Sequence, residues 1–218
     1  MERRKFIKNT AAASAAFSIV PSFVLGKNHV PPSDTLYMGA FGIGGRGGGV
    51  IRDLTNTKKV KFVSLCDVDE RQIAGSTKLH PQAKVYKDFR KVYDKHLKDI
   101  DAILVATPDH NHATIALPFM RAKKHAYVEK PLSHNINEAR IMTTVAKENG
   151  IVTQMGNQGA SSDGSRQAKE WIDSGFLGNI YKVDCWTNRP VWPQGIPVPK
   201  GCDPIPKELD WVIWLGPA

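Results

Sequence analysis

The sequence predicts an α/β fold in which a doubly wound parallel sheet is covered by helices on both faces. Three observations favour this fold. Short apolar runs alternate with amphipathic segments from residue 36 to residue 155, a glycine-rich motif follows the first apolar run, and an aspartate follows the second. Strands that alternate with helices in this way are typical of βαβ units.

The predicted elements follow one another in a regular order. Strands are expected over the apolar runs 36–41, 60–66, 84–86, 101–106, 125–128 and 151–155. Helices are expected between them over 46–56, 69–79, 88–96, 111–123 and 135–149, with a further helix over 163–175 that Gly175 closes. One more strand is predicted over 180–187. It leads into chain that holds half of the 14 prolines and four of the five tryptophans, which indicates the start of a second domain.

The glycine-rich motif is Gly42-Ile43-Gly44-Gly45-Arg46-Gly47, which has the pattern Gly-x-Gly-x-x-Gly at a predicted strand–helix junction. In such a motif the first glycine permits a tight turn, the second lets the backbone approach a pyrophosphate, and the third allows the helix to pack closely on its strand. The free N–H groups at the start of the helix then face the phosphates. The alternative interpretation is a flexible loop, because six of the eight residues 42–49 are glycine.

Asp67 decides between these interpretations. It follows the second predicted strand and lies 20 residues beyond Gly47, where a dinucleotide-binding fold places the carboxylate that holds the adenosine ribose. Capping the next helix is its alternative role, but Asp69 is at least as well placed for that. No Gly-Lys-Ser/Thr follows the glycines, so a P-loop is excluded. We therefore expect a Rossmann-type domain that prefers NAD, because Asp67 would repel the 2′-phosphate of NADP.

Composition narrows the function classes further. The chain has 218 residues, 41% of them hydrophobic, and a net charge of +9. No run has the length of a transmembrane span, and no block of Lys and Arg interleaved with aromatic residues indicates nucleic-acid binding. The three cysteines form no Cys-x-x-Cys, so zinc is not expected. Cys66 is predicted to be a core residue, and a bridge between Cys185 and Cys202 stays open in an oxidising compartment.

Residues 1–27 have the layout of an export signal. Arg3 and Arg4 precede Phe6, an alanine-rich stretch follows, and 24–26 resembles a cleavage site. The paired arginines point to the twin-arginine route and hence to the periplasm or the cell exterior. The alternative is an uncleaved N-terminal anchor, against which Pro21 and the short length argue.

Two predicted strand ends are rich in chemistry. The strand 101–106 is followed by Thr107-Pro108-Asp109-His110-Asn111-His112, and the strand 125–128 by Glu129-Lys130-Pro131. Open parallel sheets bind ligands at the carboxyl ends of their strands, so both ends should face the nicotinamide half of a bound cofactor. His110 and His112 also suggest a metal, but no third ligand stands at a suitable spacing, so no metal is expected.

Together with the glycine motif, 106–112 and 127–132 resemble the Gfo/Idh/MocA oxidoreductase family. The twin-arginine leader, 187–195 and 209–217 resemble an exported bacterial branch of that family. The resemblance extends from about residue 36 to residue 218. It implies an NAD-dependent oxidoreductase that acts on a sugar, cyclitol or glycoside by hydride transfer. The alternatives are an NAD-dependent glycoside-cleaving enzyme that uses transient oxidation and elimination, or an inactive nucleotide-binding fragment.

The resemblance also implies roles for single residues. Lys130 would lie beside the nicotinamide and the sugar carbon, where desolvation favours the neutral amine that can take up a proton. The alternative is that Lys130 is a surface lysine at a strand end. Glu129 would position Lys130 or the cofactor. The nicotinamide would have further neighbours in Thr107, Pro108, His110, His112 and Gln158. The alternative for either histidine is that it packs at the start of the helix. A sugar site, or else ordinary packing between domains, would involve Asn188, Arg189 and Trp192.

We therefore expect a leader over 1–27, a Rossmann-type domain over 34–158, and a connecting helix with an incomplete substrate domain over 159–218. Related enzymes supply a histidine, and often an aspartate, from the second domain, and neither can be assigned here. We expect the 218-residue chain alone to bind NAD without turning over sugar. A small carbohydrate is the expected partner. The sequence leaves a homo-oligomer open, and identifies neither the substrate nor the position oxidised.

Overall fold

The fold is built on one wholly parallel sheet with the strand order β3-β2-β1-β4-β5-β6. The structure is a computed structural model that describes residues 34–189 and 193–218. The predicted leader 1–27 and Trp192 lie outside the described residues. The strand order reverses between β1 and β4, which is the switch point at which such sheets bind dinucleotides.

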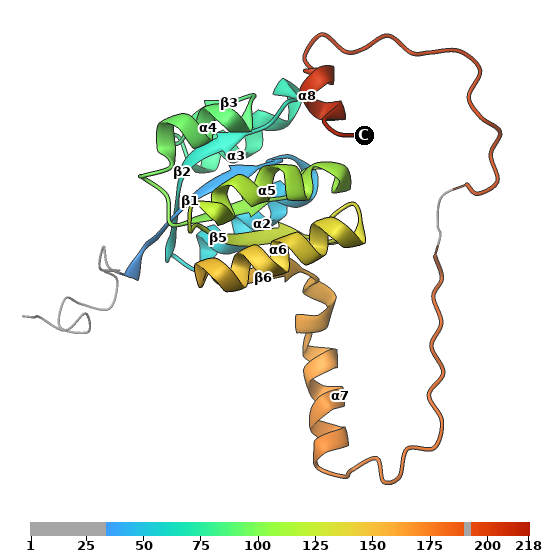
Figure 1. Cartoon of the computed structure of the whole chain (residues 1–218). Coiled ribbons are helices and arrows are strands. Elements are labelled where there is room, and N and C mark those ends of the chain that lie inside the picture. The colour runs from blue at the N-terminus through green and yellow to red at the C-terminus, as the bar shows by residue number, and fades with distance from the viewer. Residues whose placement is uncertain (1–33, 190–192) are drawn as a thin grey trace, which may run out of the picture.

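The elements alternate along the chain as Figure 1 shows. The strands are β1 (Leu36–Phe41), β2 (Val60–Cys66), β3 (Lys84–Tyr86), β4 (Ala102–Val105), β5 (His125–Glu129) and β6 (Thr153–Gly156). The helices are α2 (Gly45–Asn56), α3 (Ile73–Leu79), α4 (Phe89–His96), α5 (His112–Arg121), α6 (Ile136–Asn149), α7 (Asp163–Asp173) and α8 (Trp211–Leu215). Short 3-10 turns are η3 (Glu70–Gln72), η4 (Asp109–Asn111) and η5 (Gln158–Ser161).

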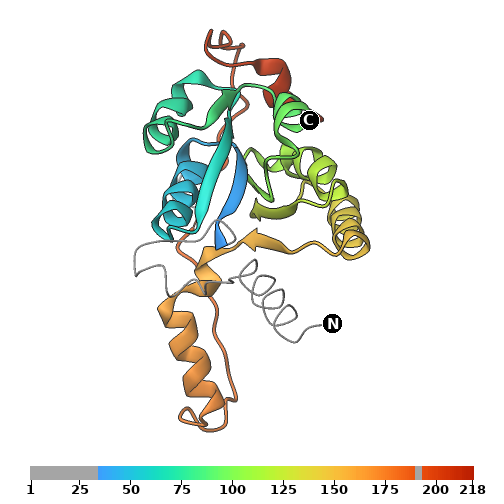
Figure 2. The same cartoon turned by 90° about the vertical axis from the view of Figure 1, so that its left-hand side faces the viewer.

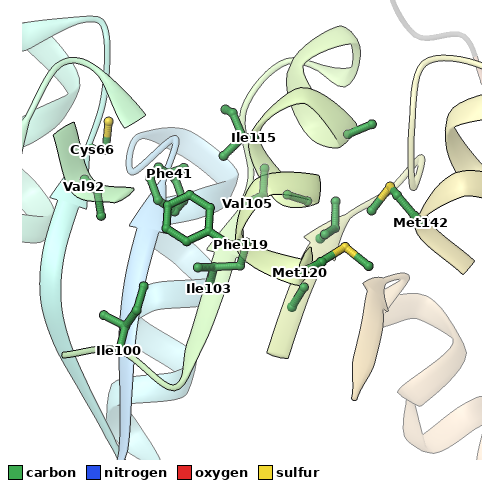
Figure 3. Close-up of a cluster of buried hydrophobic side chains, with 14 of the residues drawn as sticks. Phe41, Cys66, Val92, Ile100, Ile103, Val105, Ile115, Phe119, Met120 and Met142 are labelled. Carbon is green, nitrogen blue, oxygen red and sulfur yellow. The ribbon is translucent and has the colours of Figure 1, made fainter. Parts of the chain in front are cut away.

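Helices cover both faces of the sheet, because alternate strand residues point to opposite sides (Figure 2). On one face, Phe41, Ile103 and Val105 pack with side chains of α4, α5 and α6 (Figure 3). On the other face, Ala40 and Leu104 pack with residues of α2 and α3. The apolar strands are thus buried on both sides, and their carboxyl ends form one edge that carries the polar turns.

The predicted doubly wound α/β fold is confirmed, and each of its six predicted strands lies within two residues of the observed one. Two helix starts differ. The segment predicted as 69–79 begins with the 3-10 turn η3 before α3 follows, and the segment predicted as 111–123 becomes α5 at His112, directly after the 3-10 turn η4. At η3 the cause is local, since the Asp69 side chain accepts a hydrogen bond from the Arg71 N–H and ends the preceding loop there. Asp69, and not Asp67, is therefore the cap.

The prediction of a strand over 180–187 is wrong. This stretch has no regular secondary structure, and its residues are exposed. A single strand without a partner cannot satisfy its backbone groups or bury a face, so its β-type pattern is not sufficient. Cys185 and Cys202 are exposed and free, and so do not form the bridge considered above. In Figure 1, α7 points away from the sheet, and the chain lies at the sheet again at α8. Within the described residues, no helix is long and apolar enough to cross a membrane.

Candidate dinucleotide-binding site

The glycine motif forms a tight turn between β1 and α2. Gly42 has a φ of +73°, a left-handed conformation that favours glycine. A Cβ atom there would also lie 2.5 Å from the carbonyl oxygen of Ala106, and a Cβ on Gly47 would collide with the carbonyl oxygen of Gly42. The turn is thus packed against the end of β4. It is a fixed structure, which argues against the flexible-loop interpretation.

Helix α2 begins in this turn with its N–H groups available. Gly44 is its N-cap, no side chain caps it, and no acidic residue lies in its first turn. The first N–H groups of an α-helix have no partners within the helix, and they carry the positive end of its dipole. Gly45 and Arg46 therefore offer donors suited to an anionic group such as a pyrophosphate.

Asp67 lies directly beside this turn. Its Oδ2 accepts hydrogen bonds from the N–H of Ile43 at 2.9 Å and of Gly44 at 3.3 Å, and its Oδ1 accepts one from the N–H of Asp69 at 3.0 Å. The carboxylate thus links the end of β2 to the glycine turn on the neighbouring strand. A carboxylate has about four lone-pair positions, so these three bonds leave it room to accept one from a ligand hydroxyl.

The residues after Asp67 form two ion pairs. The Arg71 guanidinium donates to both oxygens of Asp69, at 2.6 Å from Nη2 and 2.8 Å from Nε, and its hydrogen bonds hold the pKa of Asp69 below its usual range. The Lys87 ammonium lies 2.7 Å from the Glu70 carboxylate, whose hydrogen bond raises the pKa of Lys87. Both cations at this side of the site therefore have acidic partners.

These residues surround a cavity of about 520 Å³ at the carboxyl edge of the sheet. Its walls include the glycine turn, the loop after β2, the loop after β4, and residues of the C-terminal part of the chain. The Thr107 hydroxyl is buried there without a hydrogen-bond partner, and an orphaned polar atom in a cavity wall points to a ligand. The volume lies within the usual range of ~300–1,000 Å³ for small-molecule sites. The residues that line this cavity are therefore compatible with a bound dinucleotide.

The second predicted strand end, after β5, carries Glu129 and Lys130. Glu129 is 4% exposed, and its Oε1 accepts a hydrogen bond from Arg46 Nε at 3.0 Å. Its Oε2 lies 3.3 Å from the backbone nitrogen of Lys130. Glu129 therefore joins the glycine turn to the lysine turn, in keeping with a positioning role. Lys130 itself is exposed at the carboxyl end of β5, and its peptide bond to Pro131 is cis.

His112 links the turn after β4 to the turn after β5. Its ring is 1% exposed, with Nδ1 at 2.7 Å from the Pro131 carbonyl oxygen and Nε2 at 2.8 Å from the Thr107 carbonyl oxygen. Both neighbours are carbonyl oxygens, which accept hydrogen bonds from the ring. His112 was predicted to contact the cofactor. In the structure its nitrogens serve the backbone instead, so it orders the turn that carries Lys130.

The other predicted residues divide into two groups. Pro108 lines the cavity, and His110 lies beside it with its Nε2 at 2.9 Å from the Trp214 carbonyl oxygen. Gln158 begins η5, two residues beyond the end of β6, at the same edge of the sheet. Asn188 and Arg189 are exposed in the extended segment and do not line the cavity. Among the described residues, no group of three or more His, Cys, Asp or Glu could hold a metal.

Several residues of the site were not predicted. Arg71 and Lys87 line the cavity, as do Asn111 and the aromatic residues Trp211 and Trp214. The spacing of Asp69 and Arg71 is the one local pattern that could have drawn attention to the ion pair. Asn111 donates from Nδ2 to the Trp214 carbonyl oxygen at 2.8 Å, a contact between distant parts of the chain that no sequence pattern marks.

The chain is similar to proteins of known type over its described sheet. It is 31% identical over 152 residues to inositol 2-dehydrogenase of Salmonella typhimurium, covering 68% of this chain and 45% of that protein. It is 29% identical over 161 residues to a glycosyl hydrolase family 109 protein of Shewanella pealeana, covering 63% and 35%. The crystal structure of myo-inositol 2-dehydrogenase from Lactobacillus plantarum matches with a TM-score of 0.62 at 28% identity, covering 67% and 43%.

The chain spans less than half the length of each of these three proteins. The family model described as the oxidoreductase family with an NAD-binding Rossmann fold, GFO_IDH_MocA, matches residues 37–157, more than half of the chain. This match covers every strand of the sheet, the glycine turn, Asp67 and the Lys130 turn. The chain therefore belongs to the Gfo/Idh/MocA family of oxidoreductases.

Proposed function

We propose that this chain carries the NAD-binding part of an exported oxidoreductase that acts on a sugar, cyclitol or glycoside. The observation that carries the proposal is the glycine turn. Its first N–H groups are held by Asp67 at the end of β2, and the next ones, at the start of α2, remain available for phosphates. The similarity to inositol 2-dehydrogenases supports a polyhydroxylated substrate.

The cofactor is NAD in preference to NADP. Asp67 can accept a hydrogen bond from a hydroxyl of the ribose diol, and its charge opposes a 2′-phosphate at the same place. Arg71 and Lys87, the cations among the described lining residues, are paired with Asp69 and Glu70. Both pairs are partly exposed, and exposed ion pairs contribute little, so we expect the charge of Asp67 to have a larger effect on cofactor preference than these two cations.

Titration of the purified chain with NAD and NADP tests this preference. We expect NAD to bind more tightly, and Asp67→Ala to reduce the ratio of the two affinities. Asp94→Ala is the matched control, because it removes the same charge from an exposed position on α4. A preference for NADP in the unaltered chain would refute the assignment.

At the other end of the site, Lys130 is proposed as the catalytic residue. A bound nicotinamide supplies the acceptor for a hydride from the substrate carbinol carbon. Lys130, at the carboxyl end of β5, would hydrogen-bond the reacting hydroxyl and take up its proton. The Glu129–Arg46 pair and the His112 ring would hold its turn in place. Because Lys130 is exposed here, bound cofactor and substrate would be what removes it from water.

A second candidate is glycoside cleavage by transient oxidation and elimination. The similarity to glycosyl hydrolase family 109 proteins favours it. A second protein of this kind, from Shewanella sp. strain W3-18-1, is 31% identical to this chain over 141 residues. The two candidates differ in their redox balance. Oxidation of a free sugar would accumulate NADH, whereas cleavage of a glycoside would release the leaving group without net NADH.

Export is the remaining part of the proposal, and it rests on the leader outside the described residues. Replacing Arg3 and Arg4 together by lysine should leave precursor in the cytoplasm, because the twin-arginine route requires the pair. Cell fractionation with an antibody would measure the precursor. Unchanged delivery to the periplasm would exclude the twin-arginine route.

A further inference from the structure

The C-terminal segment 208–216 is attached to the carboxyl edge of the sheet at two places. At its first end, the Glu70 N–H donates to the Glu208 carbonyl oxygen at 3.2 Å, and the Asp210 N–H donates to the Val68 carbonyl oxygen at 2.9 Å. These bonds make an antiparallel bridge between Leu209 and Asp69. The segment therefore begins on the loop that follows β2, one residue beyond Asp67.

The other end of the segment rests on the loop that follows β4. His110 and Asn111 both lie within hydrogen-bond distance of the Trp214 carbonyl oxygen, at 2.9 and 2.8 Å. A Cβ on Gly216 would collide with the Asn111 amide, so the backbone is in close contact there. In the sheet, β1 lies between β2 and β4. A segment fixed to the loops after both of these strands thus crosses in front of the glycine turn, which follows β1.

Between its two attachments the segment presents apolar side chains to the cavity. Leu209, Trp211, Ile213 and Trp214 all line it, as do the glycine turn and Asp67. The indole rings of Trp211 and Trp214 stack with centroids 5.0 Å apart at 11°, and His110 meets Trp214 edge-on at 5.4 Å. In Figure 1, α8 lies close to the start of α5, at the end of the sheet that carries the cavity. Aromatic surface in this arrangement suits a flat, weakly polar ring such as a purine.

We propose that the segment 208–216 is a wall of the dinucleotide site that packs on the adenosine half of the cofactor and slows its release. The adenosine half is the relevant one because the segment is fixed next to Asp67, whose proposed partner is the adenosine ribose. The ring contact is assigned to Trp211. This inference rests on the proposed binding of NAD, and it adds residues that lie outside the family match at 37–157.

The test compares the 218-residue chain with Trp211→Ala, Trp211→Phe and Trp186→Ala. Trp186 is 88% exposed in the extended segment, so its removal is a matched control for the loss of an indole. Binding of NADH and of ADP is measured by titration, and release of NADH by rapid displacement with excess NAD. An aromatic contact contributes ~0.5–1.5 kcal/mol beyond the area it buries, so Trp211→Ala should accelerate release and weaken ADP binding by up to about tenfold. Trp211→Phe should retain most of the affinity, and Trp186→Ala should match the unaltered chain.

Hydrogen exchange provides a measurement that needs no variant. If the segment packs on the cofactor, NADH should slow exchange of the amides of 208–216 in the unaltered chain. Equal protection with and without NADH would overturn the inference, as would equal release rates for Trp211→Ala and the unaltered chain. Tighter binding by Trp211→Ala would overturn it too, because the segment would then obstruct the site. If the unaltered chain binds neither NADH nor ADP, the proposed function fails first, and the segment has no cofactor to retain.

Discussion

Two glycines in α2 provide a matched test of the turn geometry. Gly47 and Gly49 lie two residues apart in the same helix, and each would gain about 1 kcal/mol of helix propensity on replacement by alanine. Their surroundings differ. A Cβ on Gly47 would collide with the Gly42 carbonyl oxygen and would lie 3.2 Å from the Ala106 Cβ, whereas a Cβ on Gly49 would meet nothing within 4 Å.

The expected difference follows from this contrast. Forcing an extra methyl group into a packed interior typically costs ~1–3 kcal/mol. The obstacle at Gly47 is backbone, which cannot rotate away as a side chain can, so the cost should lie in the upper part of that range. Gly49→Ala should raise the free energy of unfolding slightly. The free energy of unfolding of Gly47→Ala should be about 2–3 kcal/mol lower than that of Gly49→Ala, because both variants gain the same helix propensity.

Urea denaturation followed by far-UV circular dichroism measures the two free energies, and NAD titration measures the effect on binding. Gly47→Ala should also weaken NAD binding, because the helix can accept the methyl group only by moving away from the turn. Equal stability of the two variants would refute the close approach of α2 to the end of β1. If Gly47→Ala is less stable but binds NAD as before, then Gly47 is needed for packing and not for phosphate binding.

Two further predictions concern other parts of the molecule. In an enzyme that includes the complete second domain, Lys130→Met should retain NAD affinity and lose ~10²–10⁴-fold in turnover, as is typical of a general acid–base group; near-normal kcat would exclude this role. Burial lowers the pKa of His80 from its usual value of 6.5, so the unfolded chain binds more protons and stability should fall as the pH drops below that value. His80→Gln should flatten this dependence in urea titrations between about pH 7 and pH 5, and an unchanged slope would show that another group dominates.

The fold was largely predictable because its determinants are local. Each buried strand is a short apolar run, and each helix between strands has an apolar face, so periodicity alone finds the elements. The parallel arrangement follows from their alternation. The exception is a predicted strand that has no neighbouring strand to pair with. The stretch 180–187 has a β-type pattern, but none of the described strands lies beside it, and it remains extended and exposed.

The candidate site was predictable only in part, for a similar reason. The glycine turn and Asp67 carry a spacing that the chemistry of phosphate and ribose binding imposes, so the sequence shows them directly. The contacts of His110 and Asn111 with the Trp214 carbonyl oxygen depend on how a distant segment returns to the sheet. Asp210 does cap α8, since its Oδ1 accepts a hydrogen bond from the Ile213 N–H at 3.1 Å, but a cap and two tryptophans do not indicate where a five-residue helix will bind. In the structure, Trp211 and Trp214 line the cavity of the Rossmann-type domain itself.

Asp67 combines two tasks that are separate in principle. Its Oδ2 fixes the N–H groups of Ile43 and Gly44, and the same carboxylate is the proposed partner of the ribose diol. Cofactor preference and turn shape are therefore coupled, because removing the carboxylate frees the N–H donors of Ile43, Gly44 and Asp69 as well as the ribose contact. A buried donor left without an acceptor costs ~1–3 kcal/mol. A change of preference toward NADP would thus need a residue that still accepts from the turn without a charge, such as asparagine, together with the release of Arg71 from Asp69 toward a 2′-phosphate.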